Sequence, residues 1–157
     1  MPELDATDAR LLLELSEKPR ASGVELAHSL GLARNTVQSR LAKWDTGGRL
    51  GSIDRRVNPS ALGYPLLAFV TIRVDQHRLS AVTTALAAIP EVVEVFGLSG
   101  ASDLLVRIVA VDADDLYRIA GLILDISGVE RTNMAIAMRE LVTYRLTPVL
   151  ERAAGTA

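Results

Sequence analysis

One segment of the sequence combines polar and basic side chains at spacings that suit nucleic-acid recognition. Between residues 34 and 46 the apolar residues Val37, Leu41 and Trp44 recur at i, i+4 and i+7, which predicts a helix with one buried side. Its remaining surface carries side chains that can bond base edges or neutralise phosphates, namely Arg34, Asn35, Thr36, Gln38, Ser39, Arg40 and Lys43. We expect Arg55 and Arg56, a few residues further on, to contact the DNA backbone beside this helix.

The charge distribution favours the same interpretation. The 157 residues have a formal net charge of −2, so the chain as a whole is not a polycation. Residues 31–58 nevertheless contain six basic residues against two acidic ones, whereas residues 61–157 contain eight against eleven. A small basic face on an acidic chain is typical of DNA binding, although a solvated helix face would give the same composition.

The elements that must position this surface are three predicted helices within residues 1–50. Asp5 is the expected N-cap of the first helix, and Ser22 with Glu25 forms a capping-box pattern at the second. The second helix should stop at Gly31, and the third, over residues 34–46, at Gly47-Gly48. Two short helices joined by the turn at 31–33 predict a helix-turn-helix; an ordinary three-helix bundle with a polar face is the alternative.

The second half of the sequence contains an internal repeat. Residues 66–95 align with residues 103–132 at an offset of 37 without a gap, and Leu67, Asp75 and Leu79 meet Leu104, Asp112 and Leu116. Each copy has a strand–helix–strand pattern, at 67–74, 78–89 and 92–98 and again at 104–111, 113–126 and 131–138. Two such units predict a ferredoxin-like βαββαβ domain, with chance similarity as the alternative. A second copy of the chain is the simplest cover for the open sheet face, which predicts a homodimer.

The segment between these halves, residues 50–57, is expected to be extended, as a wing or linker strand. Turn signals at Asn58-Pro59 and at residues 63–65 place the domain boundary near residue 60. The predicted organisation is therefore α+β: a helix-turn-helix domain at 1–50, a wing or linker strand at 51–65, the βαββαβ domain at 66–148 and a tail at 149–157. We expect the tail from Glu151 onward to be disordered.

Composition argues against several classes of protein. The chain has no cysteine, and its two histidines, His28 and His77, lack metal-ligand neighbours at helical spacing, so we expect neither a metal site nor a cofactor. No basic leader precedes an apolar run, and no stretch of 18 apolar residues occurs. We therefore expect a soluble, unexported, cytoplasmic protein without a membrane partner.

Several motifs in register resemble the Lrp/AsnC family of leucine-responsive and asparagine-operon transcription regulators. The resemblance covers residues 4 to about 146. It is carried by Leu4-Asp5-x-x-Asp8, Glu25-Leu26-Ala27-x-x-Leu30-Gly31-Leu32, Thr36-Val37-x-x-Arg40-Leu41, Asn58-Pro59-x-x-Leu62-Gly63 and Ser99-Gly100-x-x-Asp103. It implies a winged helix-turn-helix joined to a βαββαβ (RAM) domain. It also implies a regulator of transcription that binds double-stranded DNA, forms homodimers and assembles further into tetramers or octamers.

The resemblance also implies an effector, usually an amino acid, bound where subunits meet. By position, the effector site would comprise Gly100, Ala101, Ser102, Asp103, Thr132 and Met134. Ala101 and Ser102 are smaller than the residues common there, and Met134 replaces a frequent threonine, which favours an apolar or aromatic amino acid. Asp103 could hold an α-amino group or simply cap the hairpin turn. Ala33 stands where the family commonly has a serine that caps the recognition helix.

Two other functions remain open at this point. Enzymes of the same architecture decarboxylate sirohaem, but the predicted βαββαβ domain has no titratable pair placed as acid and base, so an enzyme is not expected. An architectural protein that compacts DNA with little effector control would share the helix-turn-helix and differ only at the effector site; either kind of DNA-binding protein would be nucleoid-associated.

Overall fold

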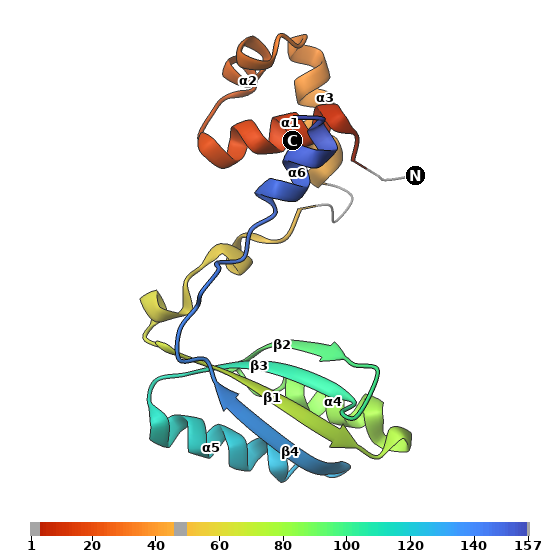
Figure 1. The fold of residues 1–157 in the computed structure, drawn as a ribbon, viewed down its shortest axis with the longest axis vertical. Helices are drawn as coiled ribbons and strands as arrows, with labels where there is room; N and C mark the ends of the chain where they lie inside the picture. The colour runs from red at the N-terminus through yellow and green to blue at the C-terminus, as the bar shows by residue number, and fades with distance from the viewer. Residues whose placement is uncertain (1–3, 46–49, 157) are drawn as a thin grey trace. The chain divides into compact units, whose positions relative to one another are not determined.

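The computed structural model describes residues 4–45 and 50–156, which form two compact units. One unit contains the residues up to Arg55 together with those from Val142 onward, and the other spans Arg56–Leu141 (Figure 1). The first unit therefore receives chain from both ends of the sequence.

The first unit contains the predicted helix-turn-helix. Helices α1 (Ala6–Glu17), α2 (Gly23–Leu30) and α3 (Arg34–Asp45) pack around a core of side chains, among them Leu11, Leu26, Val37 and Trp44. Both predicted caps are present: the Asp5 carboxylate accepts hydrogen bonds from the backbone N–H groups of Thr7 and Asp8, and Ser22 exchanges hydrogen bonds with Glu25. The predicted stop at Gly47-Gly48 lies outside the described residues.

The turn between α2 and α3 depends on glycine. Gly31 has a φ of 64°, the left-handed conformation that side chains with a Cβ rarely adopt. Its backbone N–H closes α2 on the carbonyls of Ala27 and His28. The turn between α2 and α3 that defines the motif therefore favours glycine at position 31.

The prediction of a disordered tail is wrong. Residues Thr147–Ala154 form a further helix, α6, which lies against α1 (Figure 1). Pro148 stands in its first turn, and Gly155 ends it in the left-handed conformation. The alanine-rich sequence 151–154 has high helix propensity, and packing against α1 supplies the stabilisation that so short a helix lacks alone.

The prediction of an extended wing over residues 50–57 is also wrong. The described residues 50–65 contain no strand; they form two 3₁₀ helices, Ile53–Arg56 and Pro59–Leu62. Short polar side chains favour such local turns over pairing, and Asn58 caps the second one by accepting a hydrogen bond from the Ser60 N–H. The boundary between the units lies at Arg55 and Arg56, before the turn signals near residue 60.

The second unit has the predicted βαββαβ order. Strands β1 (Leu66–Val74), β2 (Val92–Gly97), β3 (Leu104–Ala110) and β4 (Val129–Ile136) form one antiparallel sheet in the order β2-β3-β1-β4. Helices α4 (Leu79–Ala87) and α5 (Ala113–Leu124) cover one face of it (Figure 1). Alternate residues of β1, such as Val70 and Ile72, are fully buried beneath these helices.

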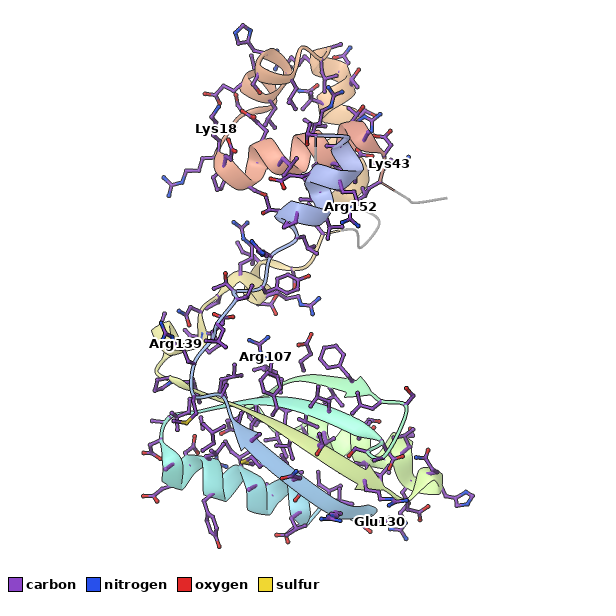
Figure 2. The ribbon with its side chains drawn as sticks, in the orientation of Figure 1. Lys18, Lys43, Arg107, Glu130, Arg139 and Arg152 are labelled. Atoms are coloured by element: carbon purple, nitrogen blue, oxygen red, sulfur yellow. The ribbon has the colours of Figure 1, made fainter. Side chains whose placement is uncertain are left out.

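The opposite face of the sheet carries apolar side chains that neither helix of this unit covers, among residues 56–141. By register, Phe69 of β1, Leu105 of β3 and Phe96 of β2 point to this side, and Phe96 is 45% exposed. Arg107 shares the face and lies 3.9 Å from the Glu94 carboxylate (Figure 2). An open apolar sheet face of this kind is suited to burial against another protein surface.

The recognition-helix N-terminus offers a test of capping energetics. Ala33 precedes α3 and accepts the backbone hydrogen bond from Val37, but it has no side-chain oxygen for the first-turn N–H groups. Ala33→Ser should therefore raise the free energy of unfolding of this unit by about 1 kcal/mol. Denaturant unfolding followed by Trp44 fluorescence measures the change. Ser22→Ala, which removes the equivalent cap from α2, should lower it by a similar amount. Equal stability of Ala33→Ser and wild type would contradict the cap assignment.

Candidate nucleic-acid interface and effector site

Helix α3 presents most of the predicted DNA-binding residues on its outer surface. Val37 and Trp44 are buried, at 0% and 2% exposure, and fix the orientation of the helix. The exposed predicted residues on this helix are Arg34, Asn35, Thr36, Gln38, Ser39 and Lys43. The helix thus displays hydrogen-bonding and cationic groups together. Lys43, one of these residues, is labelled in Figure 2.

Arg40 is less exposed than the other six predicted residues of α3. Its guanidinium donates a hydrogen bond to Asp5 Oδ1 at 2.7 Å and lies 2.9 Å from Asp8 Oδ1. Its side chain is 27% exposed, compared with 57% for Asp5. The predicted DNA contact is therefore, in this structure, part of an ion-pair cluster that joins α3 to α1.

Asp8 is the buried member of this cluster. It is 6% exposed, the one charged side chain buried among the residues described. Its Oδ2 accepts a hydrogen bond from the Asp5 backbone N–H at 3.0 Å, and its Oδ1 accepts one from Trp44 Nε1 at 3.3 Å. The motif Leu4-Asp5-x-x-Asp8 was the sequence signal for this cluster, but the pairing with Arg40 and Trp44 was not predicted.

The cluster forms one wall of an open groove between the start of α1 and α3. The groove has a volume of about 500 Å³. Its lining combines the carboxylates of α1 with polar side chains of α3, including Asn35, Thr36 and Ser39. The predicted recognition residues therefore lie beside two carboxylates as well as beside cations.

Hydrogen bonding shifts the ionisation of the exposed cluster members. The backbone N–H of Asp8, and after it the Arg40 guanidinium, lowers the pKa of Asp5 to about 2. The two carboxylates, Asp5 first, raise the pKa of Arg40. Both groups are charged at neutral pH, so the cluster is an ion pair throughout the physiological range.

Arg55 and Arg56 belong to the 3₁₀ helix Ile53–Arg56, where the chain passes from one unit to the other. Both are exposed. Their predicted contact with the DNA backbone stays a prediction.

The predicted effector loop is held in place by Asp103. The Asp103 carboxylate accepts hydrogen bonds from the Val74 backbone N–H at 2.8 Å and from Gln76 Nε2 at 2.6 Å. The β1–β4 register shifts between Arg73 and Val74, so Asp103 supplies a partner to a backbone group at an irregular point of the sheet. The carboxylate thus bonds residues at and just after the end of β1, and not the hairpin turn that it was expected to cap; Gln76 is a contact that the sequence did not indicate.

The other predicted effector residues are divided between two places. Gly100, Ala101 and Ser102 belong to the β2–β3 loop, where Gly100 has a φ of 127° that requires glycine. Thr132 and Met134 lie on β4, and Met134 packs against the core beneath the helices. Strand β1 separates β3 from β4, which places the two groups about 10 Å apart at ordinary strand spacing.

The two histidines lie in different units. His28 lies in the last turn of α2, and His77 in the 3₁₀ helix before α4. Within residues 4–45 and 50–156, no group of three or more His, Cys, Asp or Glu could hold a metal ion. In the same residues, no helix is long and apolar enough to cross a bilayer.

Comparison with known protein families assigns both units. The AsnC-type helix-turn-helix domain matches residues 4–43, and the Lrp/AsnC ligand binding domain matches residues 67–147. The chain belongs to the Lrp/AsnC family. The HTH-type transcriptional regulator FL11 of Pyrococcus horikoshii is 32% identical over 136 residues, which cover 87% of this chain and 90% of that protein. The leucine-responsive regulatory protein of Rhizobium meliloti is 35% identical over 69% of this chain and 71% of its own length.

Solved Lrp/AsnC structures have the same architecture. The structure of Escherichia coli AsnC aligns with a TM-score of 0.83 at 21% identity, covering 94% of this chain and all of that one. A feast or famine regulatory protein from M. tuberculosis, complexed with L-methionine, aligns with a TM-score of 0.78 at 29% identity, covering 90% and 96% of the two chains. The relatives are named as transcriptional regulators, so the chain is a regulator of transcription and not an enzyme of the sirohaem decarboxylase kind.

The Asp5 carboxylate should stabilise this regulator only while it is ionised. Its pKa in the folded chain, about 2, lies below its ordinary value of 3.8, so its contribution is complete above about pH 4 and is lost as the pH falls through 2. Asp5→Asn keeps an N-cap but removes the charge. Urea unfolding should show a stability gap between wild type and Asp5→Asn near pH 6 that narrows towards pH 2. A gap of constant size would contradict the ion pair.

Loss of the Asp103 carboxylate should destabilise the second unit even without an effector. Asp103→Ala leaves the Val74 N–H without its partner, which should cost roughly 1–3 kcal/mol. The measurement is amide hydrogen exchange, in which Val74 should lose protection. Asp103→Asn retains an acceptor oxygen and should keep most of it. Equal protection of Val74 in wild type and Asp103→Ala would show that the carboxylate does not fix the loop.

Proposed function

We propose that this Lrp/AsnC protein binds specific DNA sequences through α3 and that an amino acid bound at its second unit modulates this binding. The observation that carries the proposal is the pairing of an AsnC-type helix-turn-helix with a Lrp/AsnC ligand binding domain in one chain. The exposed polar surface of α3 provides the chemistry for the first activity, since its amide, hydroxyl and cationic groups can reach base edges and phosphates.

The proposed DNA contacts are divided by chemistry. Asn35, Thr36, Gln38 and Ser39 can exchange hydrogen bonds with bases, whereas Arg34 and Lys43 can also neutralise phosphates. Arg55 and Arg56 would contact the backbone beside the recognition helix. All of these side chains are exposed, which supports their proposed role as DNA contacts.

The proposed effector is an apolar or aromatic amino acid. Two solved relatives, from M. tuberculosis and Neisseria meningitidis, are described as complexes with L-methionine. In this chain the small side chains of Ala101 and Ser102 leave room beside the loop, and the part of the Met134 side chain that is not packed against the core adds a flexible apolar surface. Asp103 keeps acceptor capacity for an α-amino group in addition to the two hydrogen bonds that it already accepts.

A second copy of the chain is part of this proposal. The loop at 100–103 and the β4 residues Thr132 and Met134 lie on opposite sides of β1, and we expect residues of a second subunit to complete a pocket that uses both groups. The open apolar face around Phe69 and Phe96 supplies a surface for a homodimer, and dimers would assemble further into tetramers or octamers. In the cell such a protein would be associated with the nucleoid.

A thermal-shift screen of the twenty amino acids tests the effector proposal. A ligand at about 100 times its dissociation constant adds roughly 2.7 kcal/mol of stability, which is several degrees. We expect apolar or aromatic amino acids to shift the melting temperature and to change affinity for duplex DNA. Ala101→Trp, which fills space at an exposed loop position, should abolish the shift without unfolding the chain.

Three other outcomes of this screen would each contradict one part of the proposal. Binding of only Asn, Gln, Ser or Gly would overturn the apolar preference. A flat screen with DNA binding intact would favour the DNA-compacting protein with little effector control. A chain that binds amino acids but no duplex would contradict the function assigned to α3.

A further inference from the structure

The cluster of Asp5, Asp8, Arg40 and Trp44 contains one cation, Arg40, which the sequence predicts to contact DNA. Arg40 lies on α3 between Ser39 and Leu41, within the predicted recognition surface, yet its guanidinium is bonded to two carboxylates of α1. In a complex with DNA, Arg40 could either keep these carboxylate partners or leave them for a phosphate.

Burial favours the carboxylates. Asp8 is 6% exposed and ionised carboxylates are seldom buried without a cationic partner. Arg40 lies 2.9 Å from Asp8 Oδ1, the oxygen that also accepts the Trp44 indole N–H. Moving Arg40 to a phosphate would leave this buried charge with neutral donors only, in a place that water reaches poorly.

The geometry of the contacts explains what the cluster does. Arg40 and Trp44 are four residues apart, so they lie on one side of α3 along a single turn. Both bond to Asp8, which in turn bonds to the N-cap backbone of α1. Two adjacent points of α3 are thereby attached to one fixed point of α1, which restrains both rotation and sliding of the recognition helix.

The charge balance is consistent with this role. Two carboxylates and one guanidinium give the trio a net charge of −1, so it contributes no positive charge to phosphate binding. Asp5 remains 57% exposed beside the groove that Asn35, Thr36 and Ser39 line. Without Arg40 the groove wall would carry two negative charges next to the recognition residues.

We propose that Arg40 is a positioning residue: it fixes the recognition helix to α1 through Asp5 and Asp8 and does not contact DNA. The proposal rests on the DNA-binding function proposed for α3. Other cations of the surface, such as Arg34, would bind phosphates. Arg40 would instead align the side chains that contact bases.

The test compares affinities of variants for two DNA probes over a range of salt. One probe is a short duplex enriched by the wild-type protein from a random pool, and the other is a scrambled duplex of the same composition. Each phosphate contact contributes close to 1 to the slope of log affinity against log salt, measured between about 50 and 200 mM KCl. Selectivity is the ratio of the two affinities.

Arg40→Gln and Arg40→Lys should both lower selectivity about tenfold, the effect of misplacing one base contact, and leave the salt slope unchanged. Lysine keeps the charge but lacks the planar fork that bonds two carboxylates, so it should not rescue. The matched control is Arg34→Gln, an exposed cation of the same helix, which should lower the slope by about 1 on both probes. Circular dichroism and Trp44 fluorescence establish that each variant is folded.

Asp5→Asn separates the two roles by its effect on selectivity. If Asp5 helps Arg40 to position α3, its neutralisation should lower the ratio of the two affinities. If Arg40 serves phosphates, the ratio should stay unchanged, because the loss of one exposed carboxylate alters affinity for both probes alike. Unchanged selectivity in Asp5→Asn, a slope lowered by about 1 in Arg40→Gln, or full selectivity in Arg40→Lys would each overturn the positioning role. A wild-type protein that binds neither probe would overturn the DNA-binding proposal itself.

Discussion

The buried carboxylate of Asp8 determines how the DNA-binding unit is organised. It accepts hydrogen bonds from the first backbone N–H of the α1 cap and from Trp44, and it pairs with Arg40, so the start of α1 and the last turns of α3 share one centre. Removing one of its partners would leave an uncompensated buried charge, so the contacts that join α1 to α3 depend on one another. The polar face of α3 is held in one orientation as a result.

The second unit depends on a comparable constraint at the centre of its sheet. Strand β1 pairs with both β3 and β4, and the end of β1 is bonded to Asp103 at the base of the β2–β3 loop. The predicted effector residues therefore lie on either side of a central strand, β1. An amino acid that joined these groups across subunits would act on the sheet core directly, and the open face around Phe69 gives a second copy a place to pack.

Local signals were sufficient to predict most of this fold. Asp5 and Ser22 begin helices because their side chains accept first-turn N–H bonds, and the 37-residue repeat marks two strand–helix–strand units. The predictions that differ from the structure concern the wing, the tail and Arg40, and each difference has a physical cause. Residues 53–62 satisfy their polar groups in local turns, and α6 gains its stability from α1. Arg40 adjoins the buried stripe of α3, and its partner Asp5, 35 residues away in sequence, cannot be identified from helical periodicity.

A structure of the protein bound to its enriched DNA duplex would test the role of this cluster most directly. The cluster should persist in the complex, with the Arg40 guanidinium still within hydrogen-bonding distance of Asp5 and Asp8 while Arg34 and neighbouring polar side chains contact the duplex. An Arg40 side chain that had left both carboxylates for a phosphate or a base would contradict the assignment of Arg40 to the positioning of the recognition helix.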